Sequence, residues 1–265
     1  MLAVNILGYG QMGRQIASLL CLLGCDVVVW CRTLPEETYV QRQIKFASKL
    51  LGVPINENTI KVVSSLGELN KDAITIEAIA EDIEIKRDLY NLCRPYLLGG
   101  YYTNSSSYSP VEIGEEVGGL HFFNPITLRL VEYCPAAFTK GAGIVNLLTL
   151  LNLNSFNVID VQPNRGYLAN SLLFREIANI FFMIEQCRYS VSAIESVYAA
   201  LHKDRSIFDI VDLVGVDVTY AILDNLKVQD SSVYLPRSLR FAIEKSILGK
   251  KNKTSIKDFL NESNW

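Results

Sequence analysis

Three glycines near the start of the chain have the spacing of a phosphate-binding turn. They stand in the stretch GYGQMG and form the pattern G-x-G-x-x-G. The first glycine permits a tight turn, the second lets the backbone approach a pyrophosphate, and the third lets a helix pack closely on a strand. Amide groups at the N-terminus of the following helix would bind the phosphates. The pattern predicts that Gly8, Gly10, Gln11, Met12 and Gly13 bind a dinucleotide.

Arg32 indicates the chemistry at the ribose end of this site. In NAD-binding proteins the second strand ends in a carboxylate that binds the adenosine ribose. Here the strand ends in Trp30, Cys31 and Arg32, and a guanidinium at this place can bind a ribose 2′-phosphate. NAD and NADP both stay open as cofactors, and Arg32 favours NADP.

The elements around these residues form a strand, a helix and a second strand. The sequence predicts a buried strand over residues 2–7, an apolar helix over 14–24 and a second buried strand over 25–32. This βαβ unit predicts an α/β fold with a Rossmann-type doubly wound sheet.

Polar residues follow two further strand-like segments, at residues 73–79 and 101–103. Glu81 comes after the first segment, and Asn104 and Ser106 come after the second. Ligands of doubly wound sheets bind outside the carboxyl ends of the strands. We therefore expect these three side chains near the cofactor.

Composition limits the classes of partner. The chain has 265 residues, 49% of them hydrophobic, which is enough for two packed cores. A net charge of −3 argues against a general nucleic-acid or membrane-surface binder. Six scattered cysteines lack zinc or disulfide spacing, and apolar runs are interrupted before membrane-span length. We expect a cytoplasmic protein without a signal peptide, a metal, a membrane partner or a nucleic-acid partner.

Six motifs together resemble one enzyme family. GYGQMG, IEAIAEDIEIK, TNSSSYS, GLHFFNP, LVE and GYLANSLL occur in this order and approximate spacing, as in the L-3-hydroxyacyl-coenzyme A dehydrogenases. The resemblance implies an oxidoreductase that interconverts a 3-hydroxyacyl thioester and its 3-oxoacyl thioester by hydride transfer with NAD or NADP.

The resemblance also implies four catalytic residues. His121 in GLHFFNP matches the general acid/base, a task that suits imidazole because it titrates near neutrality. Glu132 in LVE matches the glutamate that orients this histidine. Ser106 matches the serine that hydrogen-bonds the substrate oxygen, and Asn170 in GYLANSLL matches an asparagine of the second domain.

Further cofactor contacts are implied beside the glycine turn. The matching positions are Glu81, Lys86, Asn104 and Asn124. Lys86 would lie as a cation near the nicotinamide ribose.

The second part of the chain predicts a helical domain. Residues 166–201 carry apolar residues three and four apart on more than one face. We expect a dinucleotide-binding domain over residues 1–162 and an all-helical substrate and dimerisation domain over residues 163–265. The paired apolar faces of residues 207–226 predict a helical bundle that also provides a homodimer contact, and we expect substrate in the cleft between the domains.

Departures from the family pattern open an alternative substrate. Arg205, Ser206 and Ile207 replace the usual Gly-Pro before Phe208, and the hairpin that grips coenzyme A is shortened between residues 33 and 68. A hydroxyacyl chain on an acyl carrier protein is therefore an alternative to a coenzyme A thioester. A carrier protein is acidic, so basic residues at helical spacing would dock it. Those residues are Arg42, Lys45 and Lys49.

An alternative of another class is a non-catalytic module that binds a nucleotide or an acyl thioester. The missing ribose carboxylate suggests it. The retained His121, Glu132, Ser106 and Asn170 argue against it, because a binder has little need for an acid/base pair.

Overall fold

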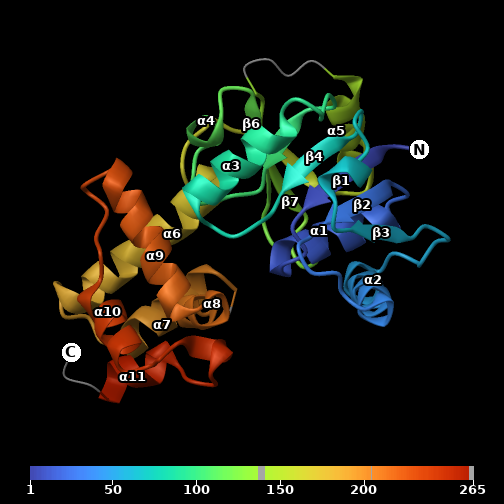
Figure 1. The fold of residues 1–265 in the computed structure, drawn as a ribbon. Helices are drawn as coiled ribbons and strands as arrows, with labels where there is room; N and C mark the ends of the chain where they lie inside the picture. Colours follow the sequence, from blue (N-terminus) through green and yellow to red (C-terminus); the bar gives the residue numbers. More distant parts are fainter. Residues whose placement is uncertain (137–140, 204, 263–265) are drawn as a thin grey trace. The chain divides into compact units, whose positions relative to one another are not determined.

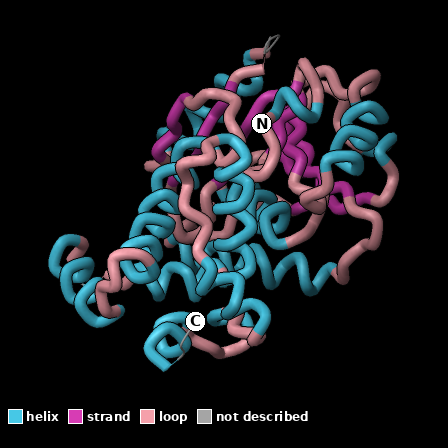
Figure 2. The backbone as a smooth tube through the Cα atoms, turned by 90° about the vertical axis from the view of Figure 1, so that its left-hand side faces the viewer, coloured by secondary structure: helices cyan, strands magenta, loops and turns pink. Residues whose placement is uncertain are grey.

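The computed structural model describes residues 1–136, 141–203 and 205–262. The chain divides into two compact units, Met1–Tyr167 and Leu168–Trp265. All strands in the described residues belong to the first unit, and the second consists of helices and loops (Figures 1 and 2).

In the described residues, eight strands form one sheet in the order β3-β2-β1-β4-β5-β6-β7-β8. The strands are β1 (Ala3–Leu7), β2 (Asp26–Trp30), β3 (Ile60–Val63), β4 (Ile74–Glu77), β5 (Tyr101–Thr103), β6 (Val117–Phe122), β7 (Leu130–Cys134) and β8 (Asn157–Asp160). Neighbouring strands are parallel except β6 and β7, which pair antiparallel. The chain reverses its direction of winding between β1 and β4, so a ligand crevice is expected there.

Helices cover both faces of the sheet because its strands are apolar on both sides. In β2, Val27 and Val29 belong to one core cluster and Val28 to another. The helices of the first cluster are α1 (Gln11–Leu22), α2 (Glu37–Leu51) and α5 (Ala142–Leu153), and those of the second are α3 (Ile83–Cys93) and α4 (Pro110–Ile113), with the short η1 (Leu66–Glu68). The prediction of a doubly wound α/β sheet is confirmed.

The second unit has its own apolar core. Its helices are α6 (Tyr167–Glu185), α7 (Val191–Leu201), α8 (Ile207–Val214), α9 (Val216–Gln229), α10 (Arg237–Glu244) and α11 (Ile256–Glu262), with the short η2 (Gly249–Lys251). Phe174, Phe181 and Phe208 are among its fully buried side chains. The helical character predicted for this part of the chain is confirmed.

The boundary between the compact units lies after Tyr167, whereas the sequence placed it after residue 162. Residues 163–167 group with the first unit because they are bonded to it. Ser109 donates to the Pro163 carbonyl, and the Arg165 guanidinium binds the Glu112 carboxylate.

Helix α6 differs from the sequence expectation in one respect. By length and composition alone, Tyr167–Glu185 is apolar enough to cross a membrane, whereas we expected every apolar run to be too short. Phe174, Ile177, Phe181 and Ile184 of this helix are buried in the core of the second unit. Core helices of soluble proteins pass the same test.

Candidate active site

The glycine turn after β1 has the geometry of a phosphate site. Gly8 has a φ of +102°, which favours glycine, and a Cβ there would lie 2.7 Å from the Ala78 carbonyl oxygen. A Cβ at Gly13 would lie 2.0 Å from the Gly8 carbonyl oxygen, so α1 packs on the turn at a distance that only glycine allows. A Cβ at Gly10 would meet no atom within 4 Å, and no side chain caps α1. The first amides of α1 are therefore available to a pyrophosphate.

A cavity of about 890 Å³ adjoins this turn. Its lining includes residues 8–12, 30–33 and 78–81, together with Lys86 and Asn104. Gln11, Met12 and Glu81 thus face the cavity, as predicted cofactor contacts should, whereas Gly13 acts in packing. The residues fit a dinucleotide, and their contact with one stays a prediction.

The cavity wall at the end of β2 carries a neutral thiol, Cys31, and a cation, Arg32, where NAD-binding proteins have a carboxylate. Cys31 is buried and its Sγ donates to the Thr33 carbonyl at 3.2 Å. Burial raises the pKa of this thiol, so it stays protonated. Arg32 is exposed and lines the cavity beside Thr33.

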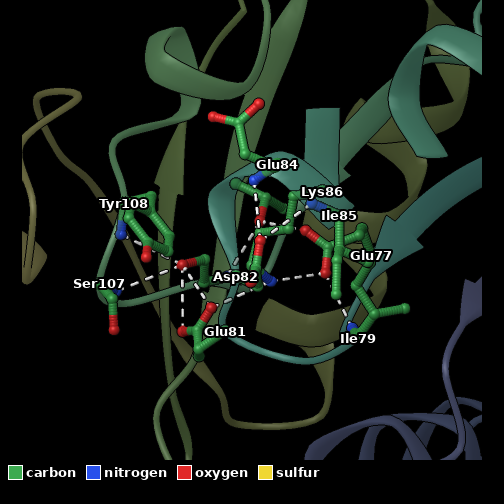
Figure 3. A network of polar contacts seen from close by, with 11 residues as sticks. Glu77, Ile79, Glu81, Asp82, Glu84, Ile85, Lys86, Ser107 and Tyr108 are labelled. Atoms are coloured by element: carbon green, nitrogen blue, oxygen red, sulfur yellow. Dashed lines mark hydrogen bonds and ion pairs between the residues drawn. The ribbon is translucent and has the colours of Figure 1, made fainter. Parts of the chain in front are cut away.

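Lys86 is a buried cation held between two carboxylates (Figure 3). Its Nζ lies 2.8 Å from Glu77 Oε1 and 3.0 Å from Glu81 Oε2. The Lys86 side chain is 1% exposed, and the Glu81 side chain is 43% exposed. Burial alone would lower the pKa of Lys86, but the two carboxylates outweigh it and raise that pKa. The ammonium stays charged at the wall of the cavity.

Glu77, which is buried behind the cavity lining, fixes the position of the Lys86 ammonium. Its fully buried carboxylate accepts hydrogen bonds from Lys86 Nζ, Thr103 Oγ1 and the Ile79 N–H, each at 2.8 Å. A carboxylate with three donors has little freedom to move, so Lys86 is held in one place.

Ser105 and Ser106 have different surroundings in the serine loop, residues 104–109. Ser105 is 3% exposed, donates to the Glu81 carboxylate, and accepts the N–H groups of Ser107 and Tyr108 at 3.2 Å. Ser105 is thus bound within the loop. Ser106 and Ser107 are both half-buried, and the binding of a substrate oxygen by Ser106 stays a prediction.

Asn104 connects the cavity to the strand that carries His121. It lines the cavity, and its Oδ1 accepts the N–H of Phe122 at 2.9 Å. Phe122 directly follows His121, so this hydrogen bond joins the cavity wall to the strand that carries the histidine.

The structure brings His121 and Glu132 together. They stand opposite each other in the antiparallel register of β6 and β7, and His121 Nδ1 lies 2.8 Å from Glu132 Oε2. Their side chains are 8% and 2% exposed. A carboxylate at Nδ1 fixes the tautomer and leaves Nε2 as the ring nitrogen that can exchange a proton with substrate.

For Asn124 and Asn170, the structure gives the exposure of the residue and its place in the fold. Asn124 is exposed at the turn after β6, with a φ of 51°, a conformation that asparagine tolerates. Asn170 is 4% exposed on α6 of the second unit, and its approach to His121 stays a prediction. Within the described residues, no cluster of His, Cys, Asp and Glu suits a metal ion.

Comparison with known proteins identifies the family. Residues 3–161 match the model of the 3-hydroxyacyl-CoA dehydrogenase NAD-binding domain. The chain belongs to the 3-hydroxyacyl-CoA dehydrogenase family. This membership confirms an oxidoreductase of the 3-hydroxyacyl-CoA dehydrogenase type that uses a nicotinamide dinucleotide.

Relatives span nearly the whole chain at low identity. A 3-hydroxybutyryl-CoA dehydrogenase of Clostridioides difficile is 25% identical, over 96% of this chain and 98% of its own length. The human mitochondrial hydroxyacyl-coenzyme A dehydrogenase is 23% identical, over 94% and 88%. The crystal structure of M. tuberculosis FadB2 superposes with a TM-score of 0.82 at 22% identity, covering 96% of this chain and 97% of that one. The chain is a divergent member of the family, with the family fold.

Sequence reasoning missed two residues of the site. Glu77 carries a signal in retrospect, because an acid inside an otherwise apolar strand needs a buried partner. Tyr167 stacks on His121, with ring centroids 5.2 Å apart and an interplanar angle of 19°. Nothing in the stretch GYLANSLL distinguishes this tyrosine from a core residue.

Proposed function

We propose that the chain interconverts a 3-hydroxyacyl thioester and its 3-oxoacyl thioester, with His121 as general acid/base and NADP as the preferred cofactor. The observation that carries this proposal is the buried His121–Glu132 pair, 2.8 Å apart, in a strand whose next residue, Phe122, donates its N–H to Asn104 of the cavity wall. The proposed substrate class rests on the matched family and on relatives that are named for hydroxyacyl-coenzyme A and 3-hydroxybutyryl-CoA.

In the oxidative direction, His121 Nε2 removes the proton of the substrate hydroxyl. A bound nicotinamide supplies the hydride acceptor in this direction and the hydride donor in reverse. Glu132 stabilises the imidazolium through Nδ1. The hydroxyl of Ser106 and the amide of Asn170 donate to the oxygen as negative charge develops on it during reduction.

The cavity lining would hold the cofactor. The amides after Gly10 would bind the pyrophosphate. The ammonium of Lys86, fixed by Glu77, and the carboxylate of Glu81 would bind the nicotinamide ribose. Asn104 and Asn124 would supply further contacts.

Preference for NADP rests on the end of β2. A neutral Cys31 stands there, and the exposed guanidinium of Arg32 lines the cavity. A charged hydrogen bond contributes about 1.5–3 kcal/mol. Arg32→Ala is therefore expected to lower kcat/KM for NADPH by roughly 10- to 100-fold and to leave the value for NADH nearly unchanged. An equal loss with both cofactors would refute the preference.

A turnover assay tests the activity itself. Purified protein is mixed with acetoacetyl-coenzyme A and either NADPH or NADH, and the product is identified as the 3-hydroxyacyl thioester. Cofactor binding is followed separately through Trp30, which lines the cavity, in a Trp265→Phe background that removes the other tryptophan. Binding without turnover on any acyl thioester would support the non-catalytic module.

A carrier-bound acyl chain is the second candidate substrate, and the exposed face of α2 favours it. Arg42, Lys45 and Lys49 are exposed there, and Phe46 between them is 54% exposed. Cations around an exposed aromatic ring suit an acidic protein partner. Lys45→Glu with Lys49→Glu should raise KM for a carrier-bound 3-oxoacyl chain and not for the same chain on coenzyme A. Equal KM values would remove this candidate.

A homodimer through α6 is part of the proposal. Leu168, Leu172 and Met183 are 49%, 65% and 42% exposed along this helix, a stripe that a second copy would cover. Sedimentation should give twice the chain mass, and Leu172→Glu should shift it toward the monomer. A monomeric wild-type protein would contradict the dimer.

A further inference from the structure

The linker segment, residues 163–167, is bonded to the serine loop at several points. Ser109 Oγ donates to the Pro163 carbonyl, and the Gly166 N–H donates to the Ser106 carbonyl at 2.7 Å. These bonds hold the backbone of the segment beside the backbone of the residue that is proposed to bind substrate.

An ion pair fixes the same segment to α4. Arg165 Nε donates to Glu112 Oε2 at 2.8 Å, and a second guanidinium nitrogen binds Oε1. Glu112 also accepts the N–H of Ser109 at 2.9 Å, and the Arg165 guanidinium lies 5.7 Å from the centroid of the Tyr108 ring. The hydrogen bond from Arg165 is the main cause that lowers the pKa of Glu112, so this carboxyl is ionised at neutral pH. The segment therefore has a rigid attachment.

The segment ends at Tyr167, whose ring lies on the imidazole of His121. The two rings are stacked, 5.2 Å between centroids and 19° between planes. Tyr167 is 2% exposed, and a Cβ at Gly119 would lie 2.4 Å from its hydroxyl. Its φ of 45° is strained for a tyrosine, and surrounding contacts must maintain it.

We propose that Tyr167 is a positioning residue for His121, and that the Arg165–Glu112 pair holds it in place. The proposal rests on the acid/base role of His121. The aromatic face restricts the imidazole to one plane, because the stacked rings pack against each other. Glu132 fixes one edge of the imidazole, and Tyr167 fixes its face.

Paired substitutions at Tyr167 test the proposal. Tyr167→Leu removes the ring and is expected to lower kcat by roughly 10- to 100-fold, with less change in KM, because a small misplacement of a catalytic group is costly. Tyr167→Phe retains the ring and should stay within about threefold of wild type. Tyr198→Leu, which removes the tyrosine stacked on His202, is the matched control and should leave kcat unchanged.

A nuclear magnetic resonance measurement separates positioning from general damage to the fold. The chain has two histidines, so His202→Gln assigns the Hε1 resonance of His121. Tyr167→Leu should move this resonance and alter the pH profile of kcat, and Tyr167→Phe should restore both. Native kcat and a native resonance in Tyr167→Leu would overturn the proposal, as would equal losses in the Leu and Phe variants. Because the resonance needs no turnover, it also distinguishes this failure from failure of the proposed activity.

The ion pair is tested by a double-mutant cycle. Arg165→Met and Glu112→Gln should each lower kcat several-fold and move the His121 resonance, and together they should cost little more than either alone. Arg165→Lys should restore part of the loss. Strictly additive effects, or unchanged resonances, would show that the pair does not act through Tyr167.

Discussion

The two histidines of this chain have the same kinds of neighbours and very different surroundings. His121 contacts Glu132 and stacks on Tyr167. His202 contacts Glu176 at 3.5 Å and stacks on Tyr198, with ring centroids 4.1 Å apart. Each imidazole thus has one carboxylate and one stacked aromatic ring, and His121 also meets Phe123 edge to face, with ring centroids 5.9 Å apart.

Burial and backbone support separate the two sites. The side chains of His121 and Glu132 are 8% and 2% exposed, whereas those of His202 and Glu176 are 41% and 39% exposed. His121 lies within a strand whose register fixes its partner, but His202 lies at the C-terminal end of α7. Water screens and competes for an exposed pair. A histidine, a glutamate and a tyrosine therefore indicate chemistry only where the fold excludes water and places a cofactor site beside them.

The largest expected effect concerns the histidines themselves. His121→Ala should lower kcat by roughly 100- to 10,000-fold, the usual contribution of a positioned acid/base. His202→Ala should leave kcat unchanged, because its pair is solvated. Steady-state assays of both variants with acetoacetyl-coenzyme A check this difference, and comparable losses would remove the contrast.

Substitution of the two glutamates that contact these histidines should also affect kcat differently, but by a smaller factor than substitution of the histidines. Glu132→Gln removes the charge that stabilises the imidazolium, so kcat should fall by roughly 10- to 100-fold. Glu176→Gln is the matched control and should have native kcat. A Glu132→Gln enzyme with wild-type turnover would mean that His121 works without its carboxylate.

The same contrast between buried and exposed pairs should hold for the free energy of unfolding, and two lysine–glutamate ion pairs test it. Glu77→Gln leaves Lys86 buried with one partner fewer, which should cost about 3 kcal/mol and weaken cofactor binding. Glu195→Gln breaks the Lys257–Glu195 pair, 2.5 Å long and partly exposed, and should change the unfolding midpoint little. Urea denaturation measures the stabilities, and Trp30 fluorescence measures cofactor affinity. Similar midpoints for the two variants would contradict the importance of burial.

The smallest effect is a pH dependence at Glu112. The pKa of this carboxyl is lowered in the folded protein, chiefly by Arg165. Its stabilisation is therefore present above the unfolded pKa and is lost as pH falls through the folded pKa. Glu112→Gln should melt below wild type at pH 7, and the difference should shrink as pH falls below the ordinary glutamate pKa, about 4.3, and disappear below the lowered pKa of the folded protein. A difference that persists in acid would show that the lost contacts do not depend on charge.

The elements that could be predicted from the sequence are those whose signals lie within one contiguous stretch of residues. The βαβ unit and its glycines are contiguous in the sequence, so spacing alone indicated them. Strand β3 is only four residues long, and the break between α6 and α7 contains neither proline nor glycine, so both were missed.

The candidate site depends on contacts that spacing does not reveal. The His121–Glu132 contact needs the antiparallel register of β6 and β7, and the resemblance supplied it before the structure did. Glu77 and Tyr167 act through partners 9 and 46 residues away, Lys86 and His121. Such pairings follow from the fold of the sheet and the path of the linker segment.

The most direct test of the central claim is a single-turnover measurement of hydride transfer. Wild type, His121→Ala and His202→Ala are saturated with NADPH, mixed with acetoacetyl-coenzyme A, and followed by loss of NADPH absorbance, with cofactor affinity measured in parallel. The account predicts that His121→Ala binds NADPH normally and transfers hydride roughly 100- to 10,000-fold more slowly, while His202→Ala matches wild type. Native transfer in His121→Ala, or a loss explained by weaker cofactor binding, would contradict it.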